Sequence, residues 1–352
     1  MGLTVRQGSD FQFMQEINLF KYLTFKRLAN AAGIYLSYGI SLILRRPVVF
    51  GMPISISIEP TSICNLKCPE CPTGTGSLLR PQGMMDIQFF KKIIDGVRKR
   101  TFYLQLFFQG EPFINNKIYE MIDYAKAKRM YVSISTNGTL FNEKNIAKLF
   151  NAAPDKLIYS FDGTDEESYN KYRVGGNFRE VKEGLEAIIA EKRKRKMNVP
   201  YIELQMIVMK HNEGRLEDFI KFGREIGVNK ITLKSMQIYS RSDAENLLPE
   251  NPEYSRYKKA EGEYVIKQKL QNRCFALWRT GVVTWDGYLA ACCFDKDAQF
   301  STESADIKDF DGLFKSKSLQ DLRRQILRDR ESIEICRNCC EGMKVNIKEI
   351  RL

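Results

Sequence analysis

The chain has 352 residues, 43% of them hydrophobic, which is enough for one large domain and a smaller one. Its net charge of +12 suits a nucleic acid, an anionic membrane face or an acidic substrate, and equally a well-solvated surface. Nine cysteines without a recognisable secretory signal favour the reducing cytoplasm. A single histidine, His211, excludes the common zinc-hydrolase motifs, which need at least two.

Residues 1–50 form a segment distinct from the rest of the chain, and we expect a helical extension. The stretch 18–27 has a mixed helical pattern, and 28–44 has no formal charge between basic pairs at 26–27 and 45–46. A membrane span needs about 20 mostly apolar residues, and this stretch is shorter and contains an asparagine and two serines. We therefore predict a helix packed on the domain. The alternative is a helix lying on an anionic membrane face.

The first strand is predicted at 54–59, where apolar and polar residues alternate. Cys64, Cys68 and Cys71 follow it with the spacing C-x3-C-x2-C, on a loop at the carboxyl end where α/β proteins bind ligands. Three thiolates can hold three irons of a 4Fe–4S cluster and leave the fourth iron open. A structural zinc site needs four ligands, and no fourth lies nearby in the sequence.

This cysteine triplet resembles the signature of the radical S-adenosylmethionine (radical SAM) enzymes. The resemblance implies that the amine and carboxylate of S-adenosylmethionine (SAM) chelate the open iron. It also implies that one electron cleaves SAM to methionine and a 5′-deoxyadenosyl radical, which abstracts a hydrogen atom from the substrate. Glu70 departs from the family pattern, in which the residue before the last cysteine is often aromatic.

A strand–helix rhythm continues from the first strand and predicts a mostly parallel sheet with right-handed crossovers. Six such units fit an α/β fold, either an open TIM-like (β/α)6 partial barrel or a doubly wound sheet, and the radical SAM resemblance favours the barrel. The further strands are expected at 102–108, 131–135, 157–161, 201–209 and 230–234, and the helices at 86–100, 116–129, 142–151, 165–172, 177–196 and 215–226.

The second strand ends at a Gly110-Glu111-Pro112 turn. This turn resembles the Gly-Gly-Glu motif of the radical SAM family, which contacts the methionine amine of SAM, although Gln109 replaces the first glycine. A carboxylate pairs with an ammonium group, and glycine lets the backbone approach closely. The resemblance therefore assigns Gly110 and Glu111 to SAM binding.

Polar residues also end the third and fourth strands, where short hydroxyl and amide groups can bind ribose or the methionine carboxylate. The segment from Ser160 to Gly163 resembles a Ser-x-Asp-Gly stretch of radical SAM enzymes that carry extra clusters, and a nearby arginine fits that neighbourhood. A turn or helix-cap role is the plain alternative for each. The predicted SAM contacts here are Ser135, Asn137, Ser160, Asp162 and Arg173.

A polar linker is expected at 237–273, followed by a second set of cysteines. Asp286-Gly287 between two apolar runs predicts a hairpin, and a helix is expected at 316–330. The cysteines flank the hairpin and form a terminal C-x2-C, which makes a compact four-thiolate site. From these residues alone, zinc and an iron–sulfur cluster fit equally well.

This arrangement resembles the SPASM domain, which holds auxiliary 4Fe–4S clusters in many radical SAM enzymes. The full pattern has seven cysteines and two clusters, whereas six cysteines are available here. We therefore expect one auxiliary cluster, with either member of two cysteine doublets open as a ligand. The expected ligands are Cys274, Cys292, Cys336 and Cys339, with Cys293 and Cys340 as the doublet partners.

Together the resemblances predict a radical SAM core at 51–236 and a SPASM-like domain at 274–352. The expected substrate is a peptide or protein, a small alcohol, or a lipid or glycan intermediate, and the expected electron donor is a flavodoxin or ferredoxin. Asp295 follows the cysteine doublet and is a candidate proton acceptor. The expected location is the cytoplasm, with 1–50 available for peripheral contact with the inner membrane face.

The alternative function is a zinc-bearing, basic nucleic-acid-binding protein, which the charge and the cysteine groups allow. Against it, the basic residues are scattered, the cysteine triplet lacks a fourth ligand, and the strand–helix rhythm is typical of an enzyme. We therefore expect no nucleic-acid partner.

Overall fold

The computed structural model describes residues 19–239, 244–300, 309–339, 341 and 348–352. Six parallel strands pair in chain order, and their order in the sheet is β1 to β6 without reversal. They are β1 (Ser55–Ile58), β2 (Tyr103–Leu106), β3 (Tyr131–Thr136), β4 (Lys156–Ser160), β5 (Tyr201–Val208) and β6 (Lys230–Ser235).

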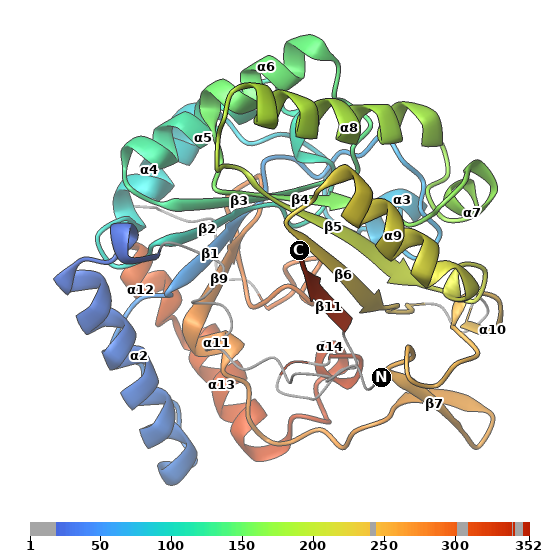
Figure 1. Ribbon diagram of the computed structural model, residues 1–352. Coiled ribbons are helices and arrows are strands. Elements are labelled where there is room, and N and C mark those ends of the chain that lie inside the picture. Colours follow the sequence, from blue (N-terminus) through green and yellow to red (C-terminus); the bar gives the residue numbers. More distant parts are fainter. Residues whose placement is uncertain (1–18, 240–243, 301–308, 340, 342–347) are drawn as a thin grey trace.

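Helices follow the strands and cover the outer side of the sheet (Figure 1). The helical segments of this part are α3 (Pro72–Thr75), α4 (Ile87–Val97), η2 (Pro112–Ile114), α5 (Ile118–Ala127), α6 (Glu143–Ala152), α7 (Glu166–Asn170), α8 (Phe178–Lys194), η3 (Glu213–Arg215) and α9 (Leu216–Ile226). A doubly wound sheet would reverse its strand order. The sequential order therefore confirms the (β/α)6 partial barrel.

The pattern of α4 explains why this helix forms and where it packs. Asp86 caps its amino terminus by accepting hydrogen bonds from two backbone N–H groups. Apolar residues then recur at helical spacing, so one side enters the core while the other stays in water. The buried residues of α4 are Ile87, Phe90, Ile93, Ile94 and Val97.

The C-terminal region adds strands to both edges of the partial barrel. The strand β9 (Thr280–Val283) pairs in parallel with β1 and antiparallel with β10 (Leu289–Ala290), and β11 (Lys348–Arg351) pairs antiparallel with β6. The hairpin predicted at Asp286-Gly287 is confirmed, with Gly287 at φ +97. The remaining helices here are α11 (Ala276–Arg279), α12 (Phe310–Phe314), α13 (Lys317–Asp329) and α14 (Glu334–Arg337).

The stretch predicted as a linker has regular structure that the sequence reasoning missed. It contains the short helix α10 (Ala244–Leu247) and an antiparallel hairpin of β7 (Tyr257–Ala260) and β8 (Glu263–Ile266). Its polar composition reflects a two-stranded ribbon with much of its surface in water.

The N-terminal extension divides differently from the prediction, into η1 (Leu19–Tyr22) and one 20-residue helix, α2 (Phe25–Leu44). Thr24 caps α2 with its side chain, which separates the two segments. Tyr22, the last residue of η1, packs at the amino-terminal ends of β2 and β3: its ring meets the Tyr131 ring edge-on at 5.7 Å, and Tyr131 stacks on Tyr103 at 4.9 Å.

Arg27 fixes α2 to the barrel. Its buried guanidinium donates to the carbonyl oxygens of Arg98, at 2.7 Å and 3.1 Å, of Tyr22 at 2.6 Å and of Arg129 at 2.7 Å. No helix among the described residues is long and apolar enough to cross a membrane.

We expect the substitution Arg27→Met to lower the free energy of unfolding by about 3 kcal/mol, because the carbonyls of Tyr22, Arg98 and Arg129 lose their donor. Lys26→Met, at the exposed neighbouring position, should change it by less than about 0.5 kcal/mol. Urea unfolding of both variants measures the difference. Equal, small effects would show that the contacts of Arg27 do not hold α2 in place.

Candidate functional site

The cysteine triplet lies on the loop after β1, at the carboxyl end of the strands. Cys68 is buried, Cys64 and Cys71 are partly buried, and none of the three is in a disulfide. All three pack in one cluster with Leu66 and Tyr172. Within the described part of the chain, no three His, Cys, Asp or Glu side chains converge closely enough to hold a metal ion as they stand.

The surroundings of the triplet nevertheless suit thiolates that bind iron. Burial raises the pKa of the Cys64 thiol, and it raises that of Cys68 to about 11. Donors face both sulfurs: the backbone N–H of Leu66 lies 3.4 Å from Cys64 Sγ, Asn137 Nδ2 3.8 Å from the same sulfur, and Arg173 Nη1 3.9 Å from Cys68 Sγ. Hydrogen bonds to sulfur stabilise metal-bound thiolates, so these residues fit the cluster that the sequence predicts.

Gly110 and Glu111 lie against this loop. Gly110 has φ +71, and a Cβ there would come within 2.4 Å of the Thr61 carbonyl oxygen, so only glycine fits. The N–H of Glu111 donates to the carbonyl of Ile63 at 2.9 Å. The Glu111 carboxylate is buried and accepts from the Asn137 N–H at 2.7 Å, and burial raises its pKa to about 7.

The other predicted SAM contacts fall into two groups. Ser135 and Ser160 lie partly buried at the carboxyl ends of β3 and β4, and Asn137 also donates to the side chain of Asn65 at 2.9 Å. Asp162 is fully buried, pairs with the guanidinium of Arg173 and accepts from the Ile207 N–H at 2.6 Å. Asp162 therefore orients Arg173 beside Cys68, and its oxygens already have protein donors.

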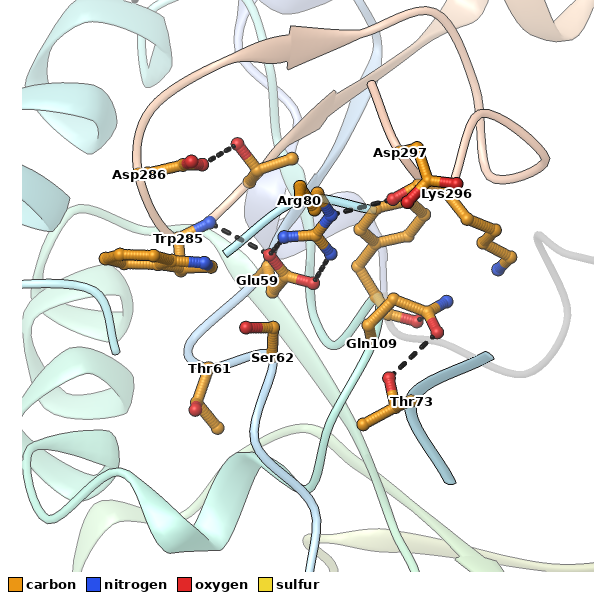
Figure 2. Close-up of polar contacts among 12 residues, drawn as sticks. Glu59, Thr61, Ser62, Thr73, Arg80, Gln109, Trp285, Asp286, Lys296 and Asp297 are labelled. Atoms are coloured by element: carbon orange, nitrogen blue, oxygen red, sulfur yellow. Dashed lines mark hydrogen bonds and ion pairs between the residues drawn. The ribbon is translucent and has the colours of Figure 1, made fainter. Parts of the chain in front are cut away.

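Figure 2 shows a buried ion pair that the sequence reasoning missed. Glu59, at the end of β1, is fully buried and pairs through both oxygens with the guanidinium of Arg80. The backbone N–H of Trp285 donates to Glu59 at 3.0 Å, and Arg80 Nε donates to the Lys296 carbonyl at 2.7 Å. The pair thus joins the barrel, the loop after the triplet, and two segments of the C-terminal region.

Lys296 and Tyr239 lie between the two cysteine sets, and neither was predicted. Lys296 Nζ is 4.9 Å from the centre of the Phe108 ring (Figure 2 labels Lys296 beside Arg80). Burial lowers the pKa of Lys296, and the nearby thiols of Cys293 and Cys71 act in the opposite direction. Burial raises the pKa of Tyr239, and the same two thiols add to that effect.

Glu70, the residue that departs from the family pattern, has a structural role. Its buried carboxylate accepts a hydrogen bond from the backbone N–H of Tyr239 at 2.6 Å. The cysteine loop is thereby tied to the segment that follows β6.

Three cysteines of the second set, Cys274, Cys336 and Cys339, lie near Arg330. Cys274, Cys336 and Cys339 are buried, Cys292 is partly buried, Cys293 is exposed, and Cys340 lies outside the described residues. Arg330 is 1% exposed, and its Nη2 lies 3.4 Å from Cys339 Sγ. Backbone N–H groups of Phe294 and Glu341 donate to Cys292 Sγ and Cys339 Sγ at 3.4 Å and 3.3 Å. This set therefore also fits metal-bound thiolates.

Asp295 is buried in the loop after Cys292 and Cys293, where its carboxylate accepts hydrogen bonds from three backbone N–H groups. The donors are Ala291 at 3.0 Å, Gln299 at 2.8 Å and Phe300 at 3.3 Å. These bonds brace the loop that carries Cys292 and Cys293. A role for Asp295 as proton acceptor remains a prediction.

Sequence comparison finds two family matches. Residues 58–223 match the Radical SAM superfamily, and residues 274–340 match SPASM, an iron–sulfur cluster-binding domain.

Three curated relatives illustrate the similarity. A mycofactocin maturase MftC from Mycobacterium ulcerans is 30% identical over 50% of this chain and 45% of its own length. An AdoMet-dependent heme synthase from Methanosarcina barkeri is 27% identical over 50% of this chain and 48% of its own length. A tungsten-containing aldehyde ferredoxin oxidoreductase cofactor-modifying protein from Pyrococcus furiosus is 24% identical over 67% of this chain and 69% of its own length. The chain thus matches about half the length of the first two.

Solved structures share the fold. SuiB from Streptococcus suis, bound to S-adenosylmethionine, has a TM-score of 0.59 at 12% identity and covers 84% of this chain and 73% of its own. AdoMet-bound anSMEcpe has a TM-score of 0.55 at 18% identity, covering 84% and 94%. BtrN in complex with AdoMet and 2-DOIA has a TM-score of 0.51 at 16% identity, covering 84% and 96%.

We expect Arg80→Met to lower the free energy of unfolding by about 3–5 kcal/mol, because it leaves the Glu59 carboxylate buried without its partner. The double variant Glu59→Gln/Arg80→Met should recover part of this loss, since the buried charge is then gone. Lys182→Met breaks an exposed pair with Glu186 and should cost less than about 1 kcal/mol. Denaturant unfolding gives the free energy of unfolding of each variant. If Arg80→Met lost no more stability than Lys182→Met, the pair of Glu59 and Arg80 would not stabilise the fold as we expect.

Proposed function

Because the chain belongs to the radical SAM superfamily and carries a SPASM iron–sulfur cluster-binding domain, we propose that it removes a hydrogen atom from a peptide substrate. The observation that carries this proposal is the cysteine triplet at the strand ends, with hydrogen-bond donors facing its sulfurs. A 4Fe–4S cluster held by these cysteines would supply the electron for the cleavage of SAM into methionine and the 5′-deoxyadenosyl radical.

In this proposal Cys64, Cys68 and Cys71 would hold the cluster, and the Glu111 carboxylate would accept a hydrogen bond from the amine of SAM. Gly110 allows the close approach that brings Glu111 to the cysteine loop. Asn137, whose amide lies beside Cys64, and Arg173, whose guanidinium lies beside Cys68, are placed to orient the methionine carboxylate.

Ser135 and Ser160 would contact the ribose, and Asp162 would act through Arg173.

The second set, Cys274, Cys292, Cys336 and Cys339, would hold the auxiliary cluster, which either accepts an electron from the substrate or binds it. The buried Arg330 offsets the negative charge of these thiolates. We propose Cys292 rather than Cys293 because the thiol of Cys292 is partly buried and near Cys274 and Cys339, whereas that of Cys293 is exposed. The proposed domain bounds remain 51–236 and 274–352.

The substrate would lie between the two cysteine sets, beside Lys296 and Tyr239, since both side chains are near Cys71 and Cys293. A peptide is favoured because one relative is named a maturase and the neighbour SuiB is solved with its precursor peptide SuiA. A small molecule is the second candidate, because BtrN is solved with 2-DOIA. We place the reaction in the cytoplasm, with a flavodoxin or ferredoxin as electron donor.

Protein reconstituted without oxygen should be brown and contain iron and sulfide at both sets. Replacing Cys64, Cys68 and Cys71 by alanine should remove one cluster and abolish formation of 5′-deoxyadenosine from SAM and dithionite. Cys292→Ala should remove only the auxiliary cluster, and Cys293→Ala should keep both. Iron analysis and chromatography measure these outcomes. A colourless protein that binds zinc, or one whose triplet variant still cleaves SAM, would overturn the proposal.

Binding of SAM should weaken as the pH falls through about 7, because Glu111 then takes up a proton and becomes a poorer hydrogen-bond acceptor for the amine of SAM. Glu111→Gln should bind SAM at least ~10-fold more weakly above pH 7 and lose this pH dependence. The control is Glu143→Gln, at an exposed position on α6. Anaerobic equilibrium dialysis of SAM with reconstituted protein gives the affinities, and an unchanged pH profile in Glu111→Gln would exclude this role.

A further inference from the structure

The helix α2 exposes an entirely apolar side. Positions that share this side by helical spacing hold only apolar residues or glycine: Phe25, Leu28, Ala29, Ala32, Tyr35, Leu36, Gly39 and Ile43. The large side chains among them are strongly exposed: 86% for Phe25, 81% for Ile43 and 60% for Leu36. Such a continuous apolar surface marks a place where a protein contacts a partner or a membrane.

The opposite side of α2 faces the protein and is mostly polar. Its buried residues are Arg27, Asn30, Ile34, Ser37 and Ser41. Their polar groups are satisfied inside the protein: Asn30 Nδ2 donates to the Met52 carbonyl at 2.9 Å, and Ser41 accepts from the Val48 N–H at 2.9 Å. The polarity of α2 is therefore inverted relative to α4, which buries five large apolar side chains.

The charges around this helix have one sign. Residues 19–50 contain five Lys and Arg residues and no Asp or Glu. Arg27 is buried, whereas Lys26, Arg45 and Arg46 are exposed near the two ends of the helix, as is Lys21, which also pairs with Asp155 at 3.6 Å. An apolar strip flanked by cations, with aromatic rings along it, is the composition of helices that lie in the interface of an anionic membrane.

We propose that α2 lies flat on an anionic membrane surface, with its apolar side among the upper acyl chains and the four exposed cations at the headgroups. The helix is about 30 Å long, and it is fixed to the barrel through Arg27, so the whole protein would dock with it. The charge argues for an anionic leaflet over a second copy of this chain, because two copies facing each other through α2 would bring like charges together.

This docking would place the auxiliary cysteine set near the membrane. The rings of Tyr35 and Tyr38 each lie 4.8 Å from the ring of Phe275, the residue after Cys274. In Figure 1, α2 projects from the barrel next to α11, on the side opposite α9. The inference goes beyond the proposed reaction and does not depend on it.

The test is sedimentation of the full chain with vesicles, either of phosphatidylcholine alone or of equal parts phosphatidylcholine and phosphatidylglycerol. We expect binding to the anionic vesicles to exceed binding to the neutral ones more than ~10-fold and to fall with added salt. The triple variant Leu28→Ser/Leu36→Ser/Ile43→Ser and the variant Arg45→Gln/Arg46→Gln should each lose at least ~10-fold of the binding.

Matched control variants distinguish binding through this surface from nonspecific binding to vesicles. Val265→Ser removes an exposed apolar side chain on β8, and Lys144→Gln/Lys148→Gln removes two exposed charges on α6, so both should bind like the parent. Circular dichroism checks that each variant is folded. Failure of the parent to bind anionic vesicles would overturn the proposal. So would light scattering that shows a dimer which the triple variant abolishes.

Discussion

The buried pair of Glu59 and Arg80 joins the barrel to the loop after the cysteine triplet and to the C-terminal region. Glu59 ends the first strand of the barrel, and Arg80 lies in the loop that follows the cysteine triplet. Both side chains also bind the backbone of the C-terminal region, at Trp285 and Lys296. Because the charges are excluded from water, the pair holds its geometry only with both partners present. The distance between the two cysteine sets is thereby set by protein contacts.

Each cysteine set also has an arginine at its side, partly buried at Arg173 and buried at Arg330. Arg173 faces Cys68 and is oriented by Asp162, and Arg330 faces Cys339 and is held by two backbone carbonyls. Buried thiols resist losing their protons, so iron must displace those protons when it binds. A fixed cation lowers the cost of the resulting negative charge.

The sequence predicted those features that depend on local patterns. Alternating strands, capped helices and the cysteine spacing lie within short stretches, and the hairpin at Asp286-Gly287 follows from two residues. The pair Glu59–Arg80 was missed because its partners are 21 residues apart with no periodic signal, and Lys296 because it approaches Cys71 from over 200 residues away. For α2, the sequence showed that residues 28–44 have no formal charge. It could not show which side of the helix faces the protein, because that depends on tertiary contacts.

The aromatic residues at the amino-terminal end of the barrel limit the directions from which molecules can reach the candidate site. Tyr22 and the stacked rings of Tyr103 and Tyr131 fill the amino-terminal end of the strands. These rings cover the amino-terminal ends of β2 and β3, so in the proposed reaction SAM and substrate would reach the cysteine triplet from the carboxyl ends of the strands.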